Sequence, residues 1–362
     1  MTTITRPSPA RSIPPSTLVG ARLPAAAPGL AAAAGIVLAI AFKFLLGWTG
    51  WLTAFFTAVL LFIVVLTVAS FRVEGRRRAK DRLASTLIYA CFVAAVVPLL
   101  LILGYIVVKG SPALSASFLS HSMSGVGPDD PGGGVYAALI GTLEQVGLAA
   151  VVALPIGLFT AIYLVEYGKG VFARAVTFFV DVMTGVPSIV AGLFVYTLLL
   201  LQSGTRPFGV AGSLALAILM LPVVVRSAEE MLRLVPRDLR DASYALGVPK
   251  WRTVVKIVLP TAMSGLITSS LLAIARVAGE TAPLILLVGY DNAINFSPFH
   301  GDQATLPMMV WDQLGKRTGN SGVPGGPWET RAWGAALVLV LVVLILNVGA
   351  RLLAKLAQPR AR

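Results

Sequence analysis

The chain has 362 residues, of which 57% are hydrophobic and only 12% are charged, whereas a soluble domain is about 45–50% apolar and about 25% charged. These proportions exclude an ordinary soluble enzyme and a disordered protein, and the single cysteine, Cys91, excludes a disulfide within the chain. The chain nevertheless has 29 Lys and Arg against 16 Asp and Glu, a net charge of +13. This excess indicates either nucleic-acid binding or the charge pattern of a membrane protein.

Residues 1–28 contain many prolines, three arginines and few large apolar side chains, so we expect a disordered N-terminal tail. Beyond residue 28 the chain contains apolar runs long enough to cross a bilayer, which takes about 20 residues. They predict an all-α integral membrane protein with about eight transmembrane helices. The approximate spans are 29–46, 51–71, 84–108, 136–165, 175–201, 209–226, 262–289 and 332–350.

The positions of the charges distinguish the two explanations of the basic excess. If both termini are cytoplasmic, the segments on the cytoplasmic side hold 22 of the 29 basic residues and a net charge of +15, whereas the external loops have a net charge of −1. This distribution follows the positive-inside rule. The sequence therefore predicts a multi-pass protein of the cell membrane in contact with lipid, and the charge requires no nucleic acid.

The spans divide into two groups. Residues 29–71 form two N-terminal transmembrane helices, and a basic cytoplasmic loop, 72–83, separates them from a larger transmembrane domain, 84–355. Outside the membrane, the loops 109–135 and 290–331 are long and rich in Gly, Pro and Asp, so we expect them either to be solvated or to contact an external partner.

The cytoplasmic segment 226–261 has the pattern of a short helix pair. Pro236 suits the first turn of a helix, and Leu239, Ala242 and Leu246 follow at spacings that form one apolar face. Such a helix has little apolar area with which to fold alone, so it needs a groove on another protein. A membrane-surface helix and a DNA reader are the alternatives, and the tether between two spans disfavours the second.

The turn and the second helix of this segment are also marked in the sequence. Gly247 lies where a helix end takes a left-handed residue, Pro249 can start a second helix, and we expect Pro260 to end it.

The spacing within this segment resembles a motif of the permease subunits of ABC importers. The motif reads Glu-Ala-Ala, three residues, Gly, nine residues, Ile, one residue, Leu-Pro. The matching residues are Asp241, Ala242, Ser243, Gly247, Ile257, Leu259 and Pro260. Every spacing agrees, with Asp for Glu and Ser for the second Ala. The resemblance implies a loop that docks on an ATPase subunit, with Gly247 as its turn and Asp241, Ala242 and Leu246 on its docking side.

Two further stretches, 185–196 and 275–284, resemble the phosphate permeases of high-affinity phosphate ABC importers, most of all the PstA-type subunit. The resemblance covers about residues 80–355 and leaves out the first two spans. It implies the six-helix core of a type I ABC importer and a role in phosphate passage. The runner-up is a permease for sulfate or molybdate; an ion-coupled secondary transporter would more often show two matching halves with broken helices.

Arg276 and Glu280 lie within the span 262–289, where a charge costs about 2.5–3.5 kcal/mol unless it is paired or faces water. Their spacing places them on one helix face, so a self-neutralising pair is one reading. In the other, Arg276 offers its guanidinium to a passing phosphate and Glu280 positions it. By resemblance, Thr281 joins them in the substrate pathway.

Small residues and a proline mark the span 175–201 as well. Pro187 interrupts the helix, and Gly185 and Gly192 lie on either side of it, which suits either close packing or a hinge. Asp181 and Glu144 are further acids within spans. Asp181 faces either the pathway or a partner helix.

The resemblance also implies the partners. They are a second permease of the PstC type, ATPase subunits of the PstB type in a pair, and an external phosphate-binding protein of the PstS type. The chain has no Walker A loop, no cysteine cluster and only two distant histidines, so we expect no catalytic residue and no metal site. ATP and Mg²⁺ would bind to the partner ATPase, and this chain would be a transport subunit with no cofactor of its own.

Overall fold

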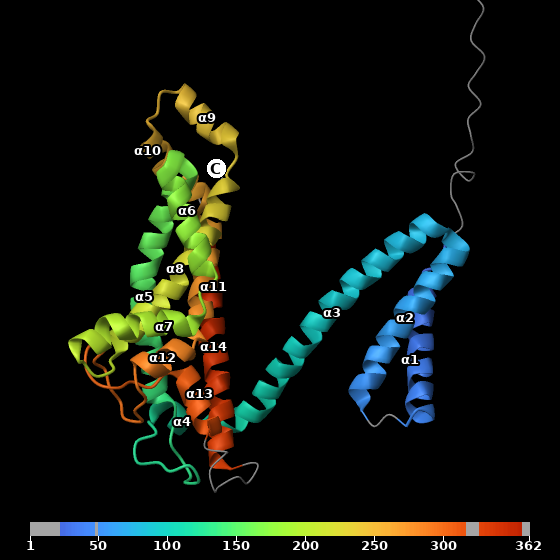
Figure 1. Cartoon of the computed structure of the whole chain (residues 1–362), viewed down its shortest axis with the longest axis horizontal. Helices are drawn as coiled ribbons and strands as arrows, with labels where there is room; N and C mark the ends of the chain where they lie inside the picture. Colours follow the sequence, from blue (N-terminus) through green and yellow to red (C-terminus); the bar gives the residue numbers. More distant parts are fainter. Residues whose placement is uncertain (1–21, 48–49, 316–325, 357–362) are drawn as a thin grey trace, which may run out of the picture. The chain divides into compact units, whose positions relative to one another are not determined.

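The computed structural model describes residues 22–47, 50–315 and 326–356. The chain divides into two compact units, Met1–Leu103 (unit 1) and Gly104–Arg362 (unit 2). Within the described ranges the secondary structure is helical throughout, with no strand (Figure 1). Most of the expected tail, residues 1–21, lies outside the described residues.

Unit 1 contains a helical hairpin of α1 (Ala27–Leu45) and α2 (Trp51–Glu74), followed by the first part of α3 (Arg76–Gly110). At Gly35 the backbones of α1 and α2 approach so closely that a Cβ atom would lie 2.9 Å from the carbonyl oxygen of Ala58. The expected loop 72–83 is helical on both sides of Gly75, which has a φ of 83°. The buried carboxylate of Glu74 stabilises this corner because it accepts hydrogen bonds from Arg82.

Unit 2 is built on four long helices. These are α5 (Tyr136–Ile162), α8 (Gly209–Arg233), α11 (Leu259–Ala278) and α14 (Pro327–Leu356). α8 packs on α5 and α11, and α14 packs on α11. Small buried residues of α8, such as Ala211, Ala215 and Ala217, allow these close contacts.

The short helices of unit 2 lie at its two ends. The pair α9 (Arg237–Ala245) and α10 (Lys250–Thr253) lies at one end, where α14 also finishes. At the opposite end are α4 (Ala116–Ser120), α13 (Leu306–Gly315) and the short turn Ser111–Ala113 (Figure 1). α13 lies inside the expected loop 290–331 and packs against α14 and α5.

Seven helices in the described ranges are long and apolar enough to cross a membrane, and a bent pair would make an eighth. The bent pair lies where a span interrupted by Pro187 is expected over 175–201. α6 (Gly170–Thr184) and α7 (Ser188–Val195), which continues as a π-helix over Tyr196–Leu201, meet at 107°. The bend falls where Pro187 lacks the backbone N–H of a helix interior.

The expectation that Pro260 ends the second helix of the 226–261 segment is wrong. α10 continues through a π-helical turn, Val254–Val258, directly into α11, so one apolar helix runs from Lys250 to Ala278. The π turn widens the helix just before Pro260 and so accommodates a residue without an N–H. The span expected over 262–289 ends at Ala278, where Gly279 is the C-cap residue, and a separate short helix, α12 (Ala282–Leu287), follows.

Arg331 attaches the loop 109–135 to the bundle. Its guanidinium is buried and donates to the side chain of Gln313 and to four backbone carbonyl groups of the loop. These carbonyl groups belong to Gly127, Pro128, Asp130 and Gly132. Both expected long loops are therefore at least partly folded onto unit 2.

Candidate functional site

A pocket of about 260 Å³ lies at the bend between α6 and α7. The bend itself forms one wall with residues such as Pro187 and Ser188, and α8 and the end of α11 form the others. Arg276 and Glu280 are the charged side chains in this lining. The structure thus brings together the two intramembrane charges and the broken helix, which are about 90 residues apart in the sequence.

Arg276 and Glu280 do not share a helix face as expected. α11 ends at Ala278 and Gly279 caps it, so Glu280 follows the helix end. In the described structure these two residues form no ion pair with each other, although both line the pocket. The reading as a self-neutralising helical pair therefore does not hold, and the guanidinium of Arg276 is available to the pocket.

Three other residues expected in the substrate pathway or at the hinge lie outside the described lining of this pocket. Thr281 is the N-cap residue of α12 and does not belong to the described lining. Gly185 caps the C-terminus of α6. Gly192 packs against α12 so closely that a Cβ atom would lie 2.8 Å from the Cα atom of Pro283.

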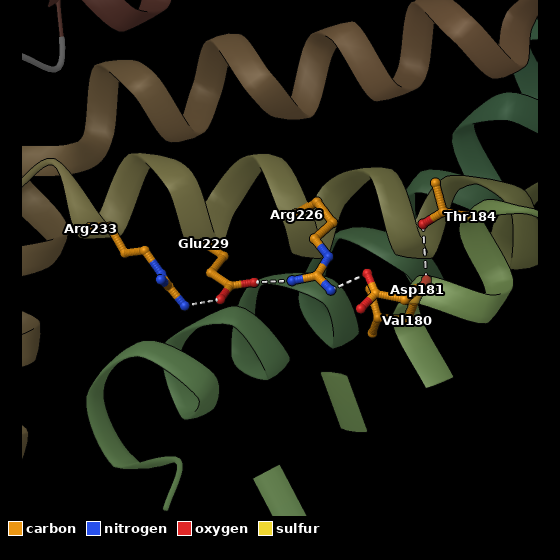
Figure 2. Close-up of polar contacts among 6 residues, drawn as sticks. All are labelled: Val180, Asp181, Thr184, Arg226, Glu229 and Arg233. Atoms are coloured by element: carbon orange, nitrogen blue, oxygen red, sulfur yellow. Dashed lines mark hydrogen bonds and ion pairs between the residues drawn. The ribbon is translucent and has the colours of Figure 1, made fainter. Parts of the chain in front are cut away.

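A chain of alternating charges joins α6 to α8 (Figure 2). Arg226 pairs with Asp181 of α6 and, at 2.9 Å, with Glu229, and Glu229 pairs in turn with Arg233. Glu229 is buried, whereas Asp181 and Arg233 are exposed. The ion pair with Arg226 shows that Asp181 contacts a neighbouring helix, α8. Arg226, Glu229 and Arg233 share one face of α8 at spacings of three and four, a signal the sequence contained.

Helix α9 is held in place by a second buried ion pair. The guanidinium of Arg240 donates to one carboxylate oxygen of Glu166, at 2.8 and 3.0 Å, and to the backbone carbonyls of Leu232 and Val235. The two side chains are only 13% and 5% exposed. Because Glu166 follows α5 and Arg240 lies in α9, this pair fixes the helix pair to the body of unit 2. Sequence reasoning missed it, since the two residues are 74 positions apart.

The turn after α9 has the geometry that the motif predicts. Gly247 has a φ of 73°, and its N–H donates to the carbonyl of Tyr244, while the N–H of Val248 donates to the carbonyl of Ser243. Ser243 is buried, and its hydroxyl shares a 2.8 Å hydrogen bond with that of Thr253 in α10. The small residue at this motif position therefore connects the two short helices.

The outer surface of α9 is free within the described structure. Asp241 and Ala242 are exposed, and the side chain of Leu246 is 83% exposed. Burial raises the pKa of the Tyr244 hydroxyl, and the nearby Glu166 carboxylate raises it further, so this group stays protonated at neutral pH. An exposed leucine on a short helix pair is what a docking helix requires.

The chain resembles known transport proteins across most of its length. Residues 153–362 match the family described as "Binding-protein-dependent transport system inner membrane component". The chain is 50% identical over 288 residues to the phosphate transport system permease protein PstA 1 of Mycobacterium tuberculosis, covering 79% of this chain and 91% of that protein. It is 38% identical over 281 residues to PstA of Yersinia pestis, covering 77% and 92%.

A solved structure supports the fold. The bacterial alginate ABC transporter, in complex with a pentasaccharide-bound periplasmic protein, contains a chain that superposes with a TM-score of 0.52. The match covers 79% of this chain and all of that chain, at 13% identity. Together with the sequence matches, this shows that the chain is a multi-pass membrane permease subunit with the fold of ABC importer permeases, and that it belongs to the PstA family of phosphate transport system permease proteins.

Proposed function

We propose that this chain forms one half of the membrane pathway of an ATP-driven importer of inorganic phosphate. A second, PstC-type permease forms the other half, a PstS-type binding protein delivers phosphate from outside, and two PstB-type subunits hydrolyse ATP with Mg²⁺. Both termini and the α9–α10 pair then lie in the cytoplasm, in keeping with the basic residues at that end. The chain itself performs no ATP chemistry.

The placement of Arg276 is the observation that carries this proposal. An arginine in a membrane-spanning bundle is costly unless it faces water or a partner, and this one faces a pocket at a helix break. Its planar guanidinium can donate two parallel hydrogen bonds to a phosphate. Glu280 in the same lining carries a negative charge, which weakens the attraction of the pocket for the anion and so allows the anion to leave. The α6–α7 bend allows the wall of the pocket to move.

Coupling to ATP hydrolysis is assigned to α9 and the Gly247 turn. Asp241, Ala242 and Leu246 are exposed on this unit, and the Arg240–Glu166 pair joins it rigidly to α5. A movement of α9 caused by the ATPase would therefore be transmitted to the transmembrane helices, because the ion pair holds the two together.

The decisive experiment is ATP-dependent phosphate uptake by the reconstituted complex, with sulfate as competitor. We expect phosphate uptake that requires ATP and that excess sulfate leaves unchanged. Inhibition by sulfate at equal concentration would favour the broader oxyanion permease. Uptake driven by an ion gradient without ATP would overturn the importer assignment.

The variant Arg276→Ala tests the role of the pocket in the same assay. We expect uptake to fall at least about a hundredfold, because the buried anion loses a charge-assisted bidentate partner. The complex should still assemble, since Arg276 forms no ion pair within the described structure. Normal uptake kinetics in this variant would show that phosphate does not depend on Arg276.

A further inference from the structure

We infer that unit 2 contains a second phosphate site, separate from the Arg276 pocket, in the hollow between α9 and the segment that joins α5 to α6. The site would take inorganic phosphate. It is argued only from residues at this end of the unit, so it does not depend on which anion the Arg276 pocket passes.

The hollow has a volume of about 740 Å³. Three segments converge on it: residues 164–169 after α5, the end of α8 with the start of α9, and the start of α10. Its charged and hydroxyl-bearing lining consists of Glu166, Lys169, Arg233, Arg237, Arg240, Asp241, Tyr244 and Lys250.

On α9 the lining residues occupy one face, separate from most of the docking surface. Arg237, Arg240, Asp241 and Tyr244 follow at spacings of three and four, whereas Leu246 does not line the hollow. Ala242 and Leu246 therefore lie outside the hollow, and Asp241 is the docking residue that also lines it.

The hollow has a surplus of positive charge after its internal pairs are counted. Arg240 is paired with Glu166, and Arg233 is paired with Glu229 of the Figure 2 chain. In the described part of the chain, the side chains of Lys169 and Arg237 form no ion pair. Lys250 lies 5.0 Å from the ring centre of Tyr167, which leaves its ammonium charge uncompensated. Three cations thus face one remaining carboxylate, Asp241.

The carboxylate of Asp241 gives the hollow its selectivity for phosphate. Inorganic phosphate retains a proton near neutral pH, because its dianion HPO4²⁻ still has one P–O–H group, whereas a phosphomonoester, with a second pKa of about 6, has lost most of its second proton. A P–O–H group can donate to Asp241 while the other oxygens accept from the cations. Sulfate and a phosphodiester headgroup have no such proton, so each would place a lone pair against the carboxylate, which is unfavourable.

Phosphate binding to the full-length chain in nanodiscs of neutral phosphatidylcholine tests this site. Arg276→Ala serves as the parent, because it removes the contribution of the first pocket. At constant ionic strength we expect the Arg276→Ala parent to bind radiolabelled phosphate. When Lys169→Ala and Arg237→Ala are added to this parent, we expect its affinity for phosphate to fall at least about tenfold. Arg174→Ala, an exposed basic residue outside the hollow, is the matched control and should change the affinity less than about twofold.

The outcomes are distinguishable. Sulfate should displace bound phosphate at least about tenfold less effectively than unlabelled phosphate, and Asp241→Asn should reduce this discrimination. Phosphatidic acid in the nanodiscs, whose phosphomonoester group is mostly deprotonated at neutral pH, should likewise displace phosphate only weakly.

Three results would overturn the proposal. They are unchanged binding in the Lys169 and Arg237 variant, displacement by equally charged phosphatidylglycerol, and loss of the site on assembly with the ATPase. The last would mean that the partner subunit occupies the hollow. Thermal unfolding without phosphate verifies that each variant is folded.

Discussion

Two arginines of unit 2 differ in whether a neighbouring acidic side chain compensates their charge. Arg240 is buried, paired with Glu166 and bonded to two backbone carbonyls, so its charge is fully compensated. Arg276 faces a pocket and forms no ion pair within the described structure. Removal of one partner from a buried ion pair leaves the other charge uncompensated, whereas an unpaired arginine at a cavity is a candidate partner for an anion.

The role of Arg240 leads to a stability prediction. Arg240→Ala would leave Glu166 buried without its partner, which typically costs about 3–5 kcal/mol. We expect a clear fall in the thermal unfolding midpoint of the purified chain. Arg237→Ala is the matched control, because this exposed neighbour on α9 has no ion pair with a described residue and should change the midpoint little. Equal midpoints for the two variants would show that the buried pair is energetically neutral.

At the scale of the element, α7 and α12 are in close backbone contact. Gly192→Ala would place a Cβ atom 2.8 Å from the Cα atom of Pro283, so α7 and α12 would have to separate. Such overpacking typically costs about 1–3 kcal/mol. We expect a lower unfolding midpoint and slower transport. Gly147→Ala is the control, since the space beside Gly147 of α5 is open; an equal loss in both variants would contradict a specific role for the α7–α12 contact.

The α9–α10 pair has its own prediction. Leu246→Ala removes an exposed apolar side chain that makes little contact within the chain, so the unfolding midpoint should remain unchanged. Loss of a central docking side chain typically costs more than about 1 kcal/mol of binding free energy. We expect the amount of ATPase subunit that co-purifies with the chain to fall several-fold. Leu234→Ala, exposed but outside α9, should retain the ATPase; identical retention in both variants would refute docking through Leu246.

At the scale of the whole molecule, the pocket, the ion-pair chain and the α9–α10 pair all belong to unit 2. Unit 1 contains the α1–α2 hairpin, and the similar region of the PstA relatives covers only 76–79% of this chain. This coverage leaves room for the prediction that the hairpin is an addition to the transport core.

This division predicts the effect of removing the hairpin. A chain that lacks residues 2–71 would begin at the basic segment 72–83, which still favours a cytoplasmic N-terminus. We expect ATP-dependent phosphate uptake per assembled complex to remain within about twofold of the full chain. Uptake should be measured against the amount of complex in the membrane, so that poor insertion is not mistaken for poor transport. A large loss per complex would assign the hairpin a direct role in transport.

Much of the fold could be predicted from the sequence because bilayer insertion depends on local composition. Runs of about 20 apolar residues marked the helices, and the docking loop was recognisable because its residues follow at fixed short spacings. Arg276 and Pro187 stood out singly, as a charge and a helix breaker in apolar surroundings. Their meeting in one pocket could not be predicted, since nothing local relates residues so far apart.

The sequence by itself determined the membrane class, the number of long apolar helices, the docking motif and the family. Only the tertiary structure decided the 107° bend, the continuous helix through Pro260 and the partners of Asp181 and Glu166. The physical reason is that hydrophobicity and motif spacing are summed along the chain, whereas an ion pair or a pocket forms between side chains that packing brings together from distant helices.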